Sequence, residues 1–128
     1  MVYMIYARMS KKEVEHIMKV CITAQGATPD AKVEERFGRA PYFILMDSET
    51  EAFEAVANPF ADGAGGVGPK AAQLILNHQV AVLISGLLGG NARAVFDAAG
   101  VSMYTYHSGG RVRDALKEFR NNTLERMK

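Results

Sequence analysis

The sequence has a single cysteine, no apolar run of the roughly 20 residues that span a bilayer, and no excess of charge of either sign. One cysteine excludes an intramolecular disulfide and a cysteine-rich zinc module. The 15 basic and 14 acidic residues give a formal net charge of +1, which provides no bulk attraction to nucleic acid or anionic lipid. We therefore expect no nucleic-acid partner and no membrane association. The N-terminus lacks the layout of a secretory signal, which predicts a cytoplasmic protein.

The composition that is present is that of a globular domain. Hydrophobic residues make up 48% and charged residues 23% of the 128 residues, which excludes intrinsic disorder and fits one domain. The first 17 residues do not share the regular pattern that begins at Met18. We predict an N-terminal extension over 1–17 and one α/β domain over 18–128. The extension is either an upstream addition from a mis-assigned start or an apolar arm through which a homo-oligomer assembles.

Apolar runs and turn residues alternate along the domain. The predicted strands lie at 19–24, 42–47, 52–57, 79–85 and 101–106, and the predicted helices begin at Pro69, Asn91 and Val112, the last ending near Met127. The short link at 48–50 makes the second and third strands a hairpin. Helix-linked strands are parallel neighbours. The pattern predicts a mixed five-stranded sheet with one antiparallel strand from the hairpin and helices on both faces.

Glycine-rich segments follow the strands of this predicted sheet. In open sheets ligands bind beyond the carboxyl ends of parallel strands, and two helix N-termini would direct amide donors there. The segment 27–40 is long enough to cover this crevice, and its two arginines would supply anion-binding guanidinium groups. The sequence therefore predicts a site for an anionic ligand, made by Gln25, Arg36, Gly38, Arg39, Gly65, Gly66, Ser85, Gly86 and Asn91.

Residues 63–68 also match the dinucleotide fingerprint G-x-G-x-x-G, but the context of that motif is absent. Residues 58–62 separate the glycines from the preceding strand. The acidic residue expected about 20 positions on is missing too, because no Asp or Glu occurs between Asp62 and Asp97. We therefore reject a Rossmann site.

Little in the sequence supports nucleophilic catalysis. Ser85 is followed by Gly86 without the G-x-S-x-G elbow. His107, at the end of the last predicted strand, is the one titrating side chain expected to face the crevice. Cys21 lies inside the first predicted strand, where core packing is favoured over metal ligation.

The segment from Val33 to Phe43, with the sequence VEERFGRAPYF, resembles the signature of the dinitrogenase iron–molybdenum cofactor biosynthesis family. The likeness continues through Asn58-Pro59, Gly65-Gly66 and Val82 to Gly86, and spans about residues 18–121. The resemblance implies a ribonuclease-H-like three-layer fold. It also implies a carrier that binds the nitrogenase cofactor or its iron–sulfur precursor.

One departure from the family pattern concerns metal binding. Carriers of the family commonly have a histidine immediately before Phe-Gly, and here that position is Arg36. Arginine stays protonated and does not ligate metal, although it can pair with an anionic cluster. His107 and Cys21 remain as candidate metal ligands. The nuclease chemistry that the fold could suggest is excluded, because strands 19–25 and 80–85 carry no carboxylate.

Three functions follow from these observations. The first is a non-catalytic binding or carrier protein for an iron–molybdenum or iron–sulfur cofactor or precursor, held by Arg36, Arg39 and the amides of the glycine loops. The alternative is a regulatory module that responds to a small anion or nucleotide and binds no metal. An enzyme ranks last, since only His107 offers a titrating group.

Overall fold

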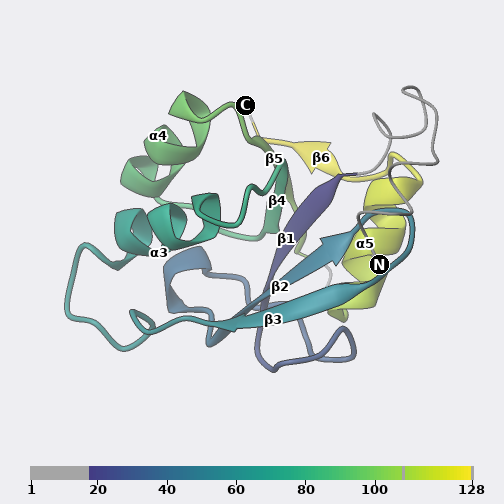
Figure 1. The fold of residues 1–128 in the computed structure, drawn as a ribbon, viewed down its shortest axis with the longest axis horizontal. Coiled ribbons are helices and arrows are strands. Elements are labelled where there is room, and N and C mark those ends of the chain that lie inside the picture. The colour runs from purple at the N-terminus through teal and green to yellow at the C-terminus, as the bar shows by residue number, and fades with distance from the viewer. Residues whose placement is uncertain (1–17, 108, 128) are drawn as a thin grey trace.

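The computed structural model describes residues 18–107 and 109–127 (Figure 1). The predicted extension 1–17, and with it the predicted oligomerisation arm, lies outside the described residues. None of the helices in the described part has the length and apolarity that a membrane crossing requires.

One mixed sheet organises the chain. Its strands are arranged in the order β3-β2-β1-β4-β5-β6. β1 pairs in parallel with β4, and β4 with β5, whereas β2 is antiparallel to β1 and β3, and β6 is antiparallel to β5. The strand bounds are β1 Lys19–Ala24, β2 Tyr42–Asp47, β3 Phe53–Ala57, β4 Val82–Ser85, β5 Ser102–Thr105 and β6 Glu125–Arg126. The predicted α/β class, hairpin and parallel crossovers are confirmed, and the ribonuclease-H-like assignment stays a prediction.

The number of strands was predicted wrongly, because the sheet has six strands rather than five. The predicted last helix continues to Met127, but the observed helix ends at Arg120. Asn122 then takes a left-handed conformation with φ 59°, which ends the helix, and the chain returns along β5. The Met127 amide donates to the Met103 carbonyl at 2.8 Å. A return this short has no apolar periodicity, so the sequence gives no signal for it.

Helices cover both faces of the sheet. A 3-10 turn, η1 Phe37–Arg39, precedes β2, and the α-helices are α3 Val67–Leu76, α4 Gly90–Ala98 and α5 Val112–Arg120. Figure 1 shows α3 and α4 on one face and α5 on the other. The predicted helix starts are therefore right to within two residues.

Successive side chains of the central strands point alternately into two separate hydrophobic cores, one on each face of the sheet. Cys21 and Leu83 face α3 and α4. In this core the Phe37 ring packs against Phe43 and Phe96, with centroids 5.2 Å and 5.3 Å away. Val20, Ile22 and Ile84 face α5 and pack against its buried residues. β1 and β4 are buried on both faces, which explains their unbroken apolar sequences.

Candidate functional site

A short stretch of main chain, residues 33–37, crosses the carboxyl ends of β1 and β4. We call it the crossing segment. Val33 packs in the core beneath α5, whereas Phe37 packs in the core beneath α3 and α4. The segment therefore passes from one face of the sheet to the other. We expected the segment 27–40 to cover an open crevice. Its residues 33–37 instead form fixed main chain across the place where that crevice was expected.

Hydrogen bonds to both strands fix the crossing segment. The Glu34 amide donates to the Thr23 carbonyl at 3.0 Å, and the Leu87 amide donates to the Glu35 carbonyl at 2.5 Å. The Thr23 hydroxyl donates to the Glu34 carbonyl at 2.5 Å, and Ser85 Oγ lies 3.2 Å from that hydroxyl. Ser85 is fully buried. The Ser85 hydroxyl therefore helps to hold the crossing segment. Ser85 and Gly86 lie beneath the main chain of this segment and do not border an open crevice.

On the α3/α4 face, two helices begin side by side. Their N-cap residues are Gly66 and Gly89, and no side chain caps either helix. Gly68, in the first turn of α3, lies so close to α4 that a β-carbon on it would be 3.3 Å from Cβ of Ala92. We call the first turns of α3 and α4, together with Arg36, the helix-start surface. Uncapped first-turn amides and two positive dipole ends make this surface suited to an anion.

Arg36 and Arg39 do different things in the structure. The Arg36 side chain is 65% exposed, and its Nε lies 3.9 Å from Glu34 Oε2. Its main chain bridges Leu87, two residues before the N-cap of α4. Arg39 instead donates from Nη1 to the carbonyls of Ala61 at 2.9 Å and Gly63 at 2.7 Å. Arg36 is therefore available to a ligand at the helix-start surface, whereas Arg39 holds the loop that leads into α3.

Asn58 was not among the predicted site residues, yet it fixes the same loop. Its buried side chain donates to the carbonyls of Gly38 at 3.1 Å and Ala40 at 2.9 Å, and its Oδ1 accepts from the Phe60 amide at 3.0 Å. Asn58-Pro59 follows a strand directly, which is the signal that marked it as a turn. Its bonds to η1 join segments about 20 residues apart, and no local pattern predicts them.

On the α5 face, a cavity of about 300 Å³ lies beside the crossing segment. His107 Nδ1 lies 2.7 Å from Glu35 Oε1 at its rim, and both side chains are about half exposed. No local sequence pattern pairs these two residues, because they lie 72 positions apart in the chain. Predicted residues Gln25 and His107 both line this cavity, and Lys32 joins them. It adjoins the face opposite to the helix-start surface.

The two candidate metal ligands are not brought together. Cys21 is fully buried in the core beneath α3 and α4, and burial raises the pKa of its thiol. His107 is at the cavity rim on the α5 face. Within residues 18–107 and 109–127, no group of three or more His, Cys, Asp or Glu side chains is placed to hold a metal ion. Within these residues, a metal-containing ligand fits best if it carries most of its own ligands.

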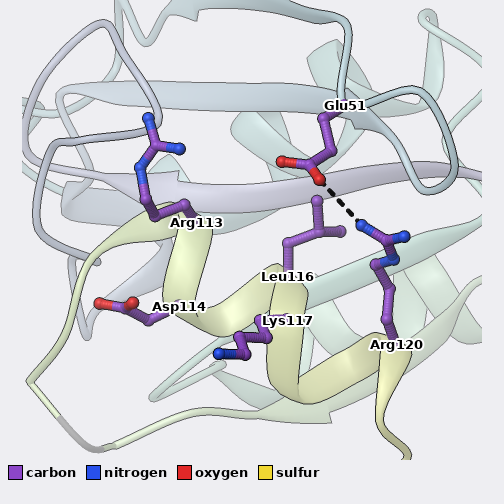
Figure 2. Close-up of a pocket in the computed structure, with 6 residues that line it drawn as sticks. All are labelled: Glu51, Arg113, Asp114, Leu116, Lys117 and Arg120. Atoms are coloured by element: carbon purple, nitrogen blue, oxygen red, sulfur yellow. Dashed lines mark hydrogen bonds and ion pairs between the residues drawn. The ribbon is translucent and has the colours of Figure 1, made fainter.

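A second cavity, of about 410 Å³, lies against α5 and is lined by three cations (Figure 2). Two of them are already paired. Arg120 Nη1 lies 2.9 Å from Glu51 Oε2, and Arg113 Nε lies 2.7 Å from Asp30 Oδ1. The hydrogen bond to Asp30 and the charge of that carboxylate raise the pKa of the Arg113 guanidinium. Because carboxylates offset most of the positive charge, this groove is a weaker anion site than the helix-start surface.

The family described as dinitrogenase iron-molybdenum cofactor matches the chain over residues 18–122. A comparison with curated proteins gave no match.

Solved structures share the fold over most of the chain. The apo form of the orange protein from Desulfovibrio gigas is 32% identical with a TM-score of 0.82, over 88% of this chain and 94% of that one. A Thermotoga protein described as a candidate NifB protein is 38% identical with a TM-score of 0.75, over 85% and 92%. A Methanocaldococcus jannaschii protein, described as a candidate dinitrogenase, is 17% identical with a TM-score of 0.64, over 88% and 96%, and supports the fold alone. The chain therefore belongs to the dinitrogenase iron–molybdenum cofactor family.

Proposed function

We propose that this protein binds and carries an anionic iron–molybdenum or iron–sulfur cofactor, or a precursor of one, on the helix-start surface. The binding is non-catalytic, and the cluster is cargo. The observation that carries the proposal is the pair of adjacent, uncapped helix N-termini at Gly66 and Gly89. Family membership, and the likeness to the Desulfovibrio orange protein, support this class of ligand.

The mode of binding follows from the residues present. The described chain offers no set of three metal ligands, so a bare ion is a poor fit. A preassembled anionic cluster fits better, because its own sulfides already surround the metal. First-turn amides would donate to those sulfides, and the exposed Arg36 guanidinium would add a charge-assisted contact.

The test mixes anaerobically purified apo-protein with a synthetic iron–sulfur or iron–molybdenum–sulfur cluster, followed by gel filtration and metal analysis. We expect metal to co-elute with the protein. Arg36→Ala should weaken retention about three- to tenfold, the effect of a charge-assisted contact worth about 1 kcal/mol. Arg120→Ala, which removes the same charge from the α5 face, is the matched control and should retain the cluster normally. Failure of metal to co-elute, or equal retention by both variants, would overturn the proposal.

A second variant separates binding from folding. Asn91 is exposed and occupies the second position of α4. Asn91→Asp places a carboxylate in the first turn of α4. The carboxylate interacts favourably with the helix dipole and stabilises the helix by about 0.3–1 kcal/mol, but it repels an anionic ligand. We expect an unchanged or higher melting temperature together with weaker cluster retention. Opposite effects of this kind do not arise from a merely structural role.

The alternative function is a module that responds to a small anion or nucleotide without metal. The same uncapped amides favour it, and so does the lack of a three-ligand set among the described residues. Thermal shift with phosphate, nucleotides and carboxylates distinguishes the two functions. A shift with these compounds, and none with clusters, would replace the carrier function by this one.

A further inference from the structure

Within the described residues, β3 is an edge strand, and no other strand pairs with its outer side. β3 is the first strand of the sheet order and has one neighbour, β2, in the described part of the chain (Figure 1). Four of its five residues are exposed. Phe53, a large apolar side chain, is 48% exposed there. An edge strand of this kind is a template for another strand.

The β2–β3 register decides which backbone groups face outward. The Asp47 amide donates to the Ala52 carbonyl at 2.9 Å, and the Asn58 amide donates to the Pro41 carbonyl at 2.9 Å. Hydrogen-bonded pairs alternate along an antiparallel ladder, so residues 52, 54, 56 and 58 bond inward to β2. The N–H and C=O groups of Phe53, Ala55 and Ala57 therefore point to the open edge.

Natural edge strands are usually blocked by proline, lysine or a bulge. The sequence of β3, FEAVA, has no proline or lysine, and its register with β2 is unbroken. Its one charge is Glu54, whose Oε1 lies 3.8 Å from Nδ1 of His78. The edge thus lacks the usual features that oppose pairing.

We propose that β3 pairs with β3 of a second copy of this chain, antiparallel and centred on Ala55. In this register Phe53 lies opposite Ala57 of the second copy, and Ala55 lies opposite its own equivalent. All three outward-facing residues then form hydrogen-bonded pairs, each pair exchanging two bonds. The small side chains of Ala55 and Ala57 leave room for the Phe53 ring, which lies on the α5 face with them.

Charge and hydrogen bonding select this register over its neighbours. In one shifted register, Phe53 lies opposite Ala55 of the second copy, and Glu54 then lies directly opposite the second Glu54. Directly opposed like charges destabilise a sheet. The opposite shift moves Phe53 beside Pro59, which has no N–H to donate. The centred register sets Glu54 opposite Val56 and uses all the outward-facing groups.

The experiment uses the full chain, with sedimentation equilibrium over about 5–300 µM. We expect an apparent mass that rises from 14.0 kDa toward twice that value. Ala55→Pro removes an outward N–H that β2 does not use, so it should keep the fold, checked by circular dichroism, and remain a monomer. Ala55→Ser keeps both the N–H and a small side chain and should still dimerise. Phe53→Lys gives a second test without changing the backbone and should also be a monomer.

Hydrogen exchange distinguishes this interface from one formed elsewhere on the chain. In the dimer, amides 53, 55 and 57 should exchange at least tenfold more slowly at high than at low protein concentration. Amides 54 and 56 bond to β2 and should be slow at both concentrations. A monomer at all concentrations, a dimer that persists in Ala55→Pro, or protection without this alternation would overturn the proposal.

Discussion

Glu35 lies so close above Gly86 that its carbonyl oxygen would be 2.8 Å from a β-carbon at that glycine, and its Cα would be 3.0 Å away. Real β-carbons do not make contacts this short, so position 86 requires glycine for space rather than for backbone conformation. The requirement comes from main chain 51 positions earlier, which passes over the end of β4. The crossing segment and the turn after β4 therefore depend on each other.

Gly86→Ala should destabilise the protein. The new methyl group must displace the Glu35 main chain and its hydrogen bond with Leu87, at a cost of about 1–3 kcal/mol. Urea unfolding measures the change in the free energy of unfolding. Gly90→Ala is the control, because a β-carbon there meets nothing within 4 Å, and its effect should stay within about 1 kcal/mol and favour folding. Similar losses in both variants would contradict the contact.

Arg39→Ala should destabilise the fold, whereas Arg36→Ala should not. Arg39 donates two hydrogen bonds to the loop carbonyls of Ala61 and Gly63 from a partly buried position. Loss of these bonds should cost about 2 kcal/mol and speed amide exchange in residues 60–66. The exposed Arg36 side chain makes no such contact, so its removal should change the unfolding free energy by less than about 0.5 kcal/mol. Equal effects on stability would contradict these separate roles.

Cys21 should be inert in the folded protein. Its thiol is fully buried, and burial raises its pKa, so both access and thiolate formation are suppressed. A thiol reagent at about pH 8 should react at least a hundredfold more slowly with native protein than with protein in concentrated guanidinium. Cys21→Ala should retain clusters as well as the unsubstituted chain does. Loss of cluster binding in a folded Cys21→Ala variant would show that the thiol is a ligand.

The Asp30–Arg113 pair should make stability depend on pH. The side-chain hydrogen bond and the charge of Arg113 lower the pKa of Asp30 from its ordinary value of 3.8. A carboxyl whose native pKa is lowered stabilises the fold above its unfolded pKa, and this contribution is lost as the pH falls through the lowered native value. Asp30→Asn should therefore reduce stability at pH 7 and show a smaller deficit at a pH well below 3.8.

Urea unfolding at the two pH values measures this difference. Asp62→Asn, which removes a charge from the exposed loop before α3, is the control and should show a smaller pH-dependent change. A deficit of Asp30→Asn that stays as large at low pH would show that packing, rather than ionisation, is responsible.

Much of the fold was predictable from local patterns. The apolar runs at β1 and β4 are unbroken because both faces of these strands are buried. The predicted helix starts at Pro69 and Asn91 lie within two residues of the observed starts of α3 and α4. The start of β4 was predicted three residues early, because Gln79 takes a left-handed conformation with φ 60° that its apolar neighbours do not indicate. β6 was missed because two exposed residues have no periodicity.

The predicted site residues share one edge of the sheet but not one crevice. Gln25 and His107 line the cavity on the α5 face. Gly65, Gly66 and Asn91 belong to the start of α3 and α4 on the other face, where Gly38 and Arg39 hold the loop before α3. The residues Ser85 and Gly86 lie beneath the crossing segment that separates the two regions.

The sequence by itself determined the α/β layering, the hairpin, the approximate starts of the helices and the family signature. These features depend on residue periodicity and turn chemistry within a few neighbouring positions, so the local sequence is enough to predict them. Only the tertiary structure decided that Glu35 meets His107, that Arg39 is used inside the protein, and that Arg36 stays exposed. Such contacts join positions far apart in the chain, and they exist because the crossing segment packs into both cores at once.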